Sequence, residues 1–128
     1  MDMDAKEIAQ HWLDALAFSA ATWNLDDHMA LVSTQVKVRG IPGVEVIDYD
    51  GWKKRRQNEF SKKLLRSLSY RLHNILAQEE DSVVFTVVET MKSSQGQIIT
   101  VDKAVNLRRE KDGQWRVIQE RIDRIELK

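Results

Sequence analysis

The sequence predicts an α+β fold in which three helices cover the concave face of a curved antiparallel sheet. Before Leu64 the apolar residues recur at helical spacing, whereas after it they alternate with polar residues at a period of two. The β-prone segments follow one another without intervening helices, and segregated runs of this kind are typical of α+β proteins. The chain of 128 residues is expected to form one domain, residues 1–128, with a core of its own.

The first two helices are predicted from capping residues and apolar faces. Asp4 suits the N-cap of a helix from about Ala5 to Ala20, because a glutamate lies three residues after it. Trp12 lies in the middle of the apolar face of this helix, where it either packs in the core or lines a cavity. A short second helix follows Asn24, which can cap it, and we expect His28 on this helix to lie at the surface.

The third helix is expected after Asp48 or Asp50, with Trp52 and Phe60 on one face. It also carries Lys53-Lys54-Arg55-Arg56, the most basic run of the chain. We interpret this run as a solvated helix face, and the alternative is a contact with phosphate or nucleic acid. The formal net charge is zero and no aromatic stacking face accompanies the run, so we expect no nucleic-acid partner.

The strands are predicted from alternation and turn residues. A short strand at Gln35–Arg39 ends before a turn that contains Pro42, and an alternating strand follows Leu64. Ser82–Met91 is apolar on both faces, which is typical of a central strand. The last two strands form a long hairpin whose arms, Gln97–Arg109 and Trp115–Ile125, are joined by a tight turn at Asp112-Gly113.

The register of this hairpin decides which charges face the helices. With a two-residue turn the predicted inward face contains Val101, Lys103, Val105, Leu107, Ile118, Glu120 and Ile122. Glu89 joins this face if Phe85 and Val87 also point inward. A charge on a covered face is costly unless it is paired, so we predict a polar cluster of Glu89, Lys103 and Glu120 as candidate catalytic residues. The alternatives are a structural ion pair near the sheet edge, or a longer turn that places these charges in solvent.

Several segments carry a resemblance to a known superfamily: Trp23–Asp27, Val36–Gly40, Gly51-Trp52 with Glu59-Phe60, and Asp112–Val117. With the order of the elements, they make the chain resemble the nuclear transport factor 2-like (NTF2-like or SnoaL-like) superfamily, which has a cystatin-like fold. The resemblance implies a cone with an apolar pocket, and commonly a homodimer formed through the convex face of the sheet. The candidate ligand-binding residues are Trp12, Trp52, Phe60, Tyr70, Phe85, Val105 and Leu107.

One activity of this superfamily is not expected. Ketosteroid isomerases use a tyrosine and two aspartates, and the matching positions hold Trp12, Gly40 and Val105. The three histidines are dispersed, without the spacing of metal ligands, and no phosphate-binding loop is visible, so we expect no metal and no cofactor.

Three functions remain open. The first is binding of a small, largely apolar molecule, with a carboxylate or carbonyl near Lys103. The second is a proton-transfer enzyme of isomerase, cyclase or dehydratase type, with Glu89 or Glu120 as base, Lys103 as electrophile and Tyr70 as donor. The third is a structural or regulatory homodimer with a filled pocket. We expect a cytoplasmic protein, because the N-terminus lacks the pattern of a signal peptide, and no membrane partner, because no apolar stretch approaches ~20 residues.

Overall fold

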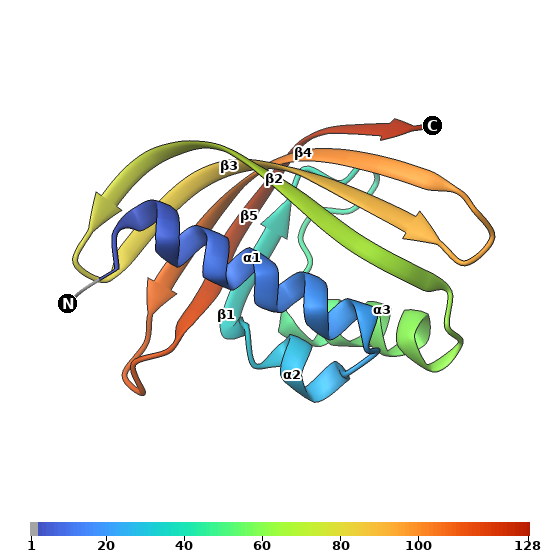
Figure 1. Cartoon of the computed structure of the whole chain (residues 1–128), viewed down its shortest axis with the longest axis horizontal. Coiled ribbons are helices and arrows are strands. Elements are labelled where there is room, and N and C mark those ends of the chain that lie inside the picture. Colours follow the sequence, from blue (N-terminus) through green and yellow to red (C-terminus); the bar gives the residue numbers. More distant parts are fainter. Residues whose placement is uncertain (1–2) are drawn as a thin grey trace.

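The structure is a computed structural model that describes residues 3–128, and it shows the expected α+β architecture, with three helices on the concave face of a five-stranded sheet (Figure 1). The strand order is β1-β5-β4-β3-β2. Strands β2 to β5 pair antiparallel, but β1 pairs parallel with β5, so the sheet is mixed rather than wholly antiparallel. The elements are α1 (Ala5–Ala21), α2 (Leu25–Met29), β1 (Val32–Arg39), α3 (Tyr49–Ser61), β2 (Leu65–Glu79), β3 (Ser82–Ser93), β4 (Ile98–Arg109) and β5 (Trp115–Leu127).

Each helix begins at a side-chain cap, as the sequence predicts. The carboxylate or amide oxygens of Asp4, Asn24 and Asp48 accept hydrogen bonds of 2.9, 3.0 and 2.9 Å from the backbone N–H three residues later. Asp48, and not Asp50, therefore caps α3. These bonds satisfy backbone donors that the first turn of a helix leaves free.

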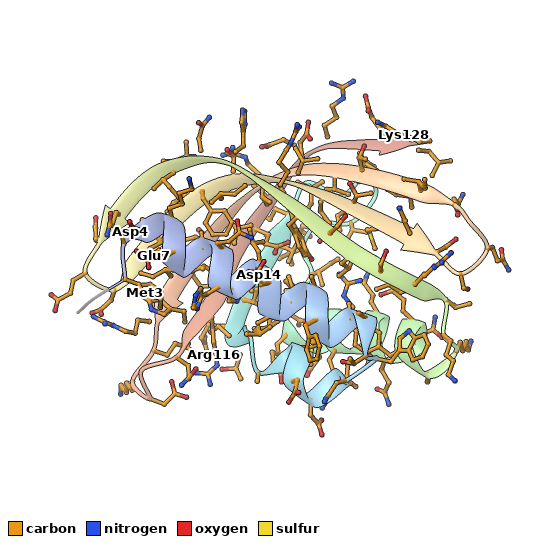
Figure 2. All side chains as sticks on the ribbon, in the orientation of Figure 1. Met3, Asp4, Glu7, Asp14, Arg116 and Lys128 are labelled. Carbon is orange, nitrogen blue, oxygen red and sulfur yellow. The ribbon has the colours of Figure 1, made fainter. Side chains whose placement is uncertain are left out.

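The turn between β4 and β5 is longer than the two residues predicted. The carbonyl of Glu110 accepts a hydrogen bond of 2.8 Å from the N–H of Gly113, and Gly113 has a φ of +84°, which favours glycine. Arg116, labelled in Figure 2, stabilises this turn with an ion pair of 2.8 Å to Asp112, and it also donates a hydrogen bond to the carbonyl of Ala30. Val117, expected on the outer face, is as a result fully buried.

A β-bulge in β5 compensates for the longer turn. Leu107 pairs with Val117, and the residue before it, Asn106, pairs with Gln119, so Ile118 has no partner on β4. Ile118 therefore does not take the inward position that the sequence predicts for it. Beyond the bulge Val105 pairs with Glu120, which is the predicted register. The concave face thus presents the charged residues that the sequence assigns to it, although the turn differs.

The main core lies between α1 and the inner face of the sheet. In β3 every second residue from Val83 to Glu89 is buried, and β3 lies between β2 and β4, which confirms that it is a central strand. Trp12 on α1 packs edge to face on Phe85 with ring centroids 6.4 Å apart. None of the helices described in residues 3–128 is long and apolar enough to cross a membrane.

Candidate functional site

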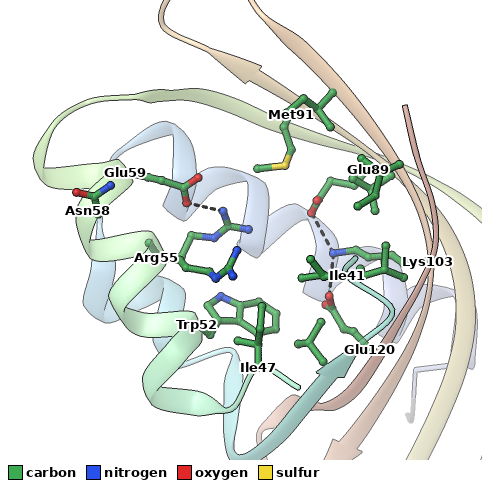
Figure 3. A pocket seen from close by; sticks show the side chains of 16 residues that line it. Ile41, Ile47, Trp52, Arg55, Asn58, Glu59, Glu89, Met91, Lys103 and Glu120 are labelled. Carbon is green, nitrogen blue, oxygen red and sulfur yellow. Dashed lines mark hydrogen bonds and ion pairs between the residues drawn. The ribbon is translucent and has the colours of Figure 1, made fainter. Parts of the chain in front are cut away.

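A cavity of about 430 Å³ lies between α3 and the concave face of the sheet (Figure 3). Nine of the sixteen residues in its walls are apolar and six are charged, and clefts of this kind with convergent polar groups are the usual sites for small molecules. The apolar lining consists of Val38, Ile41, Ile47, Trp52, Met91, Ile99, Val101, Ile122 and Ile125. The polar lining consists of Arg55, Arg56, Asn58 and Glu59 from α3, and Glu89, Lys103 and Glu120 from the sheet.

The three sheet residues meet in one buried cluster. Nζ of Lys103 lies 3.0 Å from Oε2 of Glu89 and 3.1 Å from Oε1 of Glu120, and each of the three side chains is at most 5% exposed. They come from β3, β4 and β5, so the register of two strand pairs brings them together. The lysine ammonium also lies 5.8 Å from the ring centroid of Tyr70, on β2. The convergence of Glu89, Lys103 and Glu120 that the sequence predicts is therefore present in the structure.

The two carboxylates differ in their proton affinity. Burial raises the pKa of both groups, and contact with Lys103 opposes this effect. At Glu89 the charges of Lys103 and Arg56 outweigh burial, so its pKa lies below the usual value. At Glu120 burial and the negative charge of Glu89 prevail, and its pKa lies above the usual value. A pair of carboxyl groups with opposite shifts can divide the roles of base and acid.

Two polar atoms in this cluster lack a partner. The second oxygen of Glu120, Oε2, and the hydroxyl of Tyr70 are both buried without a hydrogen bond to any residue in the described part of the chain. Burial and the charge of Glu89 raise the pKa of Tyr70 well above its usual value, so the phenol stays protonated. Unpartnered buried polar groups cost free energy and recur where a site has a task other than stability.

His28 is buried, which corrects the expectation that it lies at the surface. Its side chain is 0% exposed and lies between α1, α2 and α3. Nδ1 lies 3.0 Å from the hydroxyl of Ser19, and Nε2 lies 3.2 Å from Nε1 of Trp52 and 3.3 Å from Nε of Arg56. The ring of Phe60 also packs edge to face against it at 5.4 Å. His28 therefore joins the helices behind the cavity.

The hydrogen bonds determine the tautomer of His28. The single hydroxyl proton of Ser19 is donated to the carbonyl of Leu16 at 2.8 Å, so Ser19 accepts from His28 and Nδ1 carries the imidazole proton. Nε2 is then free to accept from both Trp52 and Arg56. Burial, together with the positive charge of Arg56, lowers the pKa of His28 to about 3. A neutral histidine thus orients two side chains that line the cavity.

The wall formed by α3 is rich in hydrogen-bond donors. Nη1 of Arg56 forms an ion pair of 2.7 Å with Glu59, and its Nε donates to His28. Burial opposes the charge of Arg56, but Glu59 and Glu89 raise its pKa above the usual value. Arg55 and Asn58 are exposed at the rim of the cavity, and Figure 3 shows both on α3.

Most of the predicted ligand-binding residues lie outside the cavity lining. Only Trp52 among them lines the cavity. Trp12, Phe85, Val105 and Leu107 are buried in the main core, because α1 packs closely on that half of the sheet. Phe60 belongs to a second cluster with Ala20, Leu65 and Leu68, and Tyr70 lies behind the Lys103 cluster.

The interpretation of the basic run as a solvated helix face is wrong for Arg56. Lys53, Lys54 and Arg55 are exposed as expected, but Arg56 is largely buried. The signal was present in the spacing, since Arg56 lies four residues after Trp52 and four before Phe60, on the inner face of the helix. For His28 the comparable signal is its position three residues after Leu25, on the inner edge of α2.

The position that holds an aspartate in ketosteroid isomerases cannot carry a side chain in this chain. Gly40 has a φ of +97°, and a Cβ there would lie 2.2 Å from the carbonyl oxygen of Ile122. Val105, at the second such position, is buried in the core. Residues 3–128 contain no group of three or more histidine, cysteine or acidic residues arranged to hold a metal ion.

Comparison with known proteins supports the fold and not a specific activity. No protein-family model matches the chain, and no curated protein matches it. Among solved structures, an NTF2-like protein from Cytophaga hutchinsonii has a TM-score of 0.70 at 15% identity, covering 94% of this chain and 98% of its own. A ketosteroid isomerase-like protein from Erwinia carotovora has a TM-score of 0.65 at 13% identity, with coverage of 92% and 91%. A protein of unknown function with a cystatin-like fold from Nostoc punctiforme has a TM-score of 0.69 at 13% identity, with coverage of 100% and 96%.

Proposed function

We propose that this chain, whose fold is NTF2-like, binds a small and largely apolar molecule in the cavity beneath α3. The observation that carries the proposal is the cavity itself. Its volume of about 430 Å³ lies within the ~300 to 1,000 Å³ of ordinary ligand sites. A filled pocket, as in a purely structural or regulatory homodimer, would have left a smaller space.

A thermal-shift screen of small apolar alcohols, ketones and acids tests this proposal. A ligand at ~100 times its dissociation constant adds about 2.7 kcal/mol to the free energy of unfolding. Ile122→Trp is the control, because Ile122 is half-buried in the cavity wall and an indole there fills the space. Stabilisation of the wild type that is absent in Ile122→Trp supports the proposal, and a screen in which no compound raises the Tm contradicts it.

A proton-transfer enzyme is the second candidate, and the convergence of Glu89, Lys103 and Glu120 within 3.1 Å in the cavity wall favours it. In such a reaction Glu89 removes a proton from the carbon next to a ligand carbonyl, and the ammonium of Lys103 stabilises the negative charge that develops on the carbonyl oxygen. Exchange of these carbon-bound protons with D₂O, followed by NMR on 2-tetralone, measures the step directly. If the protein accelerates exchange above the rate in buffer and Glu89→Gln abolishes the acceleration, the result supports an enzyme. If exchange stays at the buffer rate, the enzyme candidate is refuted and only the binding function remains.

We also propose that two copies associate through the outer face of the sheet, as the NTF2-like fold suggests. Ala104 lies near the centre of that face, opposite Thr86 on β3 and Arg121 on β5. Around it, side chains on β3 and β4 alternate between buried inner positions and half-exposed outer ones. A mass equal to two chains in light scattering supports this association.

A further inference from the structure

The charges along the cavity are not evenly balanced. Lys103 is within 3.1 Å of two carboxylates, Glu89 and Glu120, which already offset its positive charge. A ligand anion beside Lys103 would also lie beside both carboxylates and would be repelled by any that is ionised. The deep end of the cavity therefore does not favour an anionic group.

The opposite wall carries the excess of positive charge. Arg56 is paired with Glu59 at 2.7 Å, but Arg55 forms no ion pair with any residue from 3 to 128. Asn58 lies three residues after Arg55, on the adjacent turn of α3, and its side-chain amide makes no hydrogen bond to the described residues. These two lining residues leave a guanidinium and an amide N–H group without a partner among the described residues.

The position of this wall suits the head of an amphipathic molecule. Arg55 and Asn58 are exposed, so an anion bound there keeps part of its hydration and avoids the cost of full burial. From the rim, the cavity continues inward between Trp52 on α3 and the apolar side chains of Val101 and Ile122 on the sheet. The apolar body of such a molecule then lies in the cavity while its charge stays at the mouth.

We propose, on the basis of the ligand-binding function above, that the ligand is a small apolar carboxylic acid whose carboxylate is held by Arg55 and Asn58 on α3, and not by Lys103. The planar guanidinium of Arg55 offers the paired N–H groups that carboxylates accept, and Asn58 adds one further donor. The ligand enters with its apolar end first and stops short of the Glu89–Lys103–Glu120 cluster.

Three naphthalene probes of similar size separate the alternatives: 2-naphthoate, the neutral 2-naphthylmethanol and the cationic 2-naphthylmethylammonium. Isothermal titration calorimetry measures the affinity of each for the full chain. We expect 2-naphthoate to bind most tightly at low salt, and its advantage over the neutral alcohol to shrink as salt is added. Equal affinities of the acid and the alcohol in the wild type would overturn the inference while leaving the ligand pocket intact.

Two single substitutions on α3 locate the charge responsible. Arg55→Gln removes the guanidinium. Lys54→Gln removes one positive charge from the preceding residue of the helix, and Lys54 does not line the cavity. Both side chains are exposed, so both variants are expected to fold. Arg55→Gln should weaken 2-naphthoate roughly fivefold and leave 2-naphthylmethanol unchanged, whereas Lys54→Gln should change neither.

The remaining outcomes also decide the matter. If Arg55→Gln and Lys54→Gln weaken 2-naphthoate equally, the effect is one of overall charge and the assignment to Arg55 is wrong. If none of the three probes binds the wild type, the proposed ligand pocket fails together with this inference. Binding of the neutral probe alone supports the pocket and refutes the carboxylate site.

Discussion

Oε1 of Glu120 lies 3.1 Å from Nζ of Lys103, a contact that joins β5 to β4 on the covered side of the sheet. The contact exists because Glu120 pairs with Val105, two residues along β4 from Lys103. Two neighbouring strands thus place opposite charges diagonally across the ladder, where both side chains are 4% exposed. The burial of each charge is consequently tolerated because the other charge pairs with it.

Lys103→Met should destabilise the protein strongly. It leaves Glu89 and Glu120 buried without their counter-charge, and removal of one partner from a buried ion cluster costs about 3 to 5 kcal/mol. Glu120→Gln should cost less, because the ion pair between Lys103 and Glu89 at 3.0 Å remains. Urea denaturation of both variants measures the difference, and equal losses would show that Glu120 is as necessary to the cluster as the lysine.

The folded protein should lose stability below about pH 6.5 because of His28. Its pKa is lowered from 6.5 to about 3 on folding, so between these values the unfolded state binds the extra proton. The contribution is complete above pH 6.5 and is lost as the pH falls toward 3, at about 1.4 kcal/mol per pH unit for one proton. Urea denaturation between pH 4 and pH 7 measures this slope.

NMR of the imidazole nitrogens tests the same residue directly. At pH 5 we expect His28 to be neutral with its proton on Nδ1, because Ser19 accepts at that atom and Nε2 accepts from two donors. His73→Gln, which removes an exposed histidine, provides the control for assigning the signals. A doubly protonated His28 at pH 5 would contradict the arrangement of the helices around it.

Gly40→Ala should destabilise the protein more than Gly43→Ala. Both glycines have positive φ, of +97° and +78°, so each alanine carries a conformational cost of about 1 kcal/mol. At Gly40 the new Cβ also meets the carbonyl oxygen of Ile122 at 2.2 Å, whereas nothing lies within 4 Å at Gly43. Thermal denaturation should therefore show a clearly lower Tm for Gly40→Ala, and equal Tm values would mean that β1 and β5 can separate at no cost.

Ala104→Arg should separate the proposed dimer. A long charged side chain on the outer face introduces an unpaired charge into an interface between two sheets, while the inner face of β4 is unchanged. Light scattering should give a mass near 14.9 kDa for the variant and twice that for the wild type. A wild type that is monomeric at all concentrations refutes the dimer.

Local physical chemistry explains most of the fold that could be predicted from the sequence. A cap such as Asp4 acts on a backbone N–H three residues away, and the alternation of apolar and polar residues after Leu64 depends only on which side of a strand each residue occupies. These features are determined over a few residues, so they can be recognised without knowing the rest of the molecule. The inward position of Lys103 and Glu120 is different: the two-residue turn that predicts it is not formed, and the bulge at Ile118 in β5 restores the predicted register beyond it.

Tertiary structure decided what no short segment contains. The sequence alone determined the α+β order and the helix starts. The packing of α3 against α2 brought His28 and Arg56 into contact, and these residues lie 28 positions apart in the chain. The same packing placed the cavity against α3 rather than against Trp12, because α1 covers the other half of the sheet too closely to leave space.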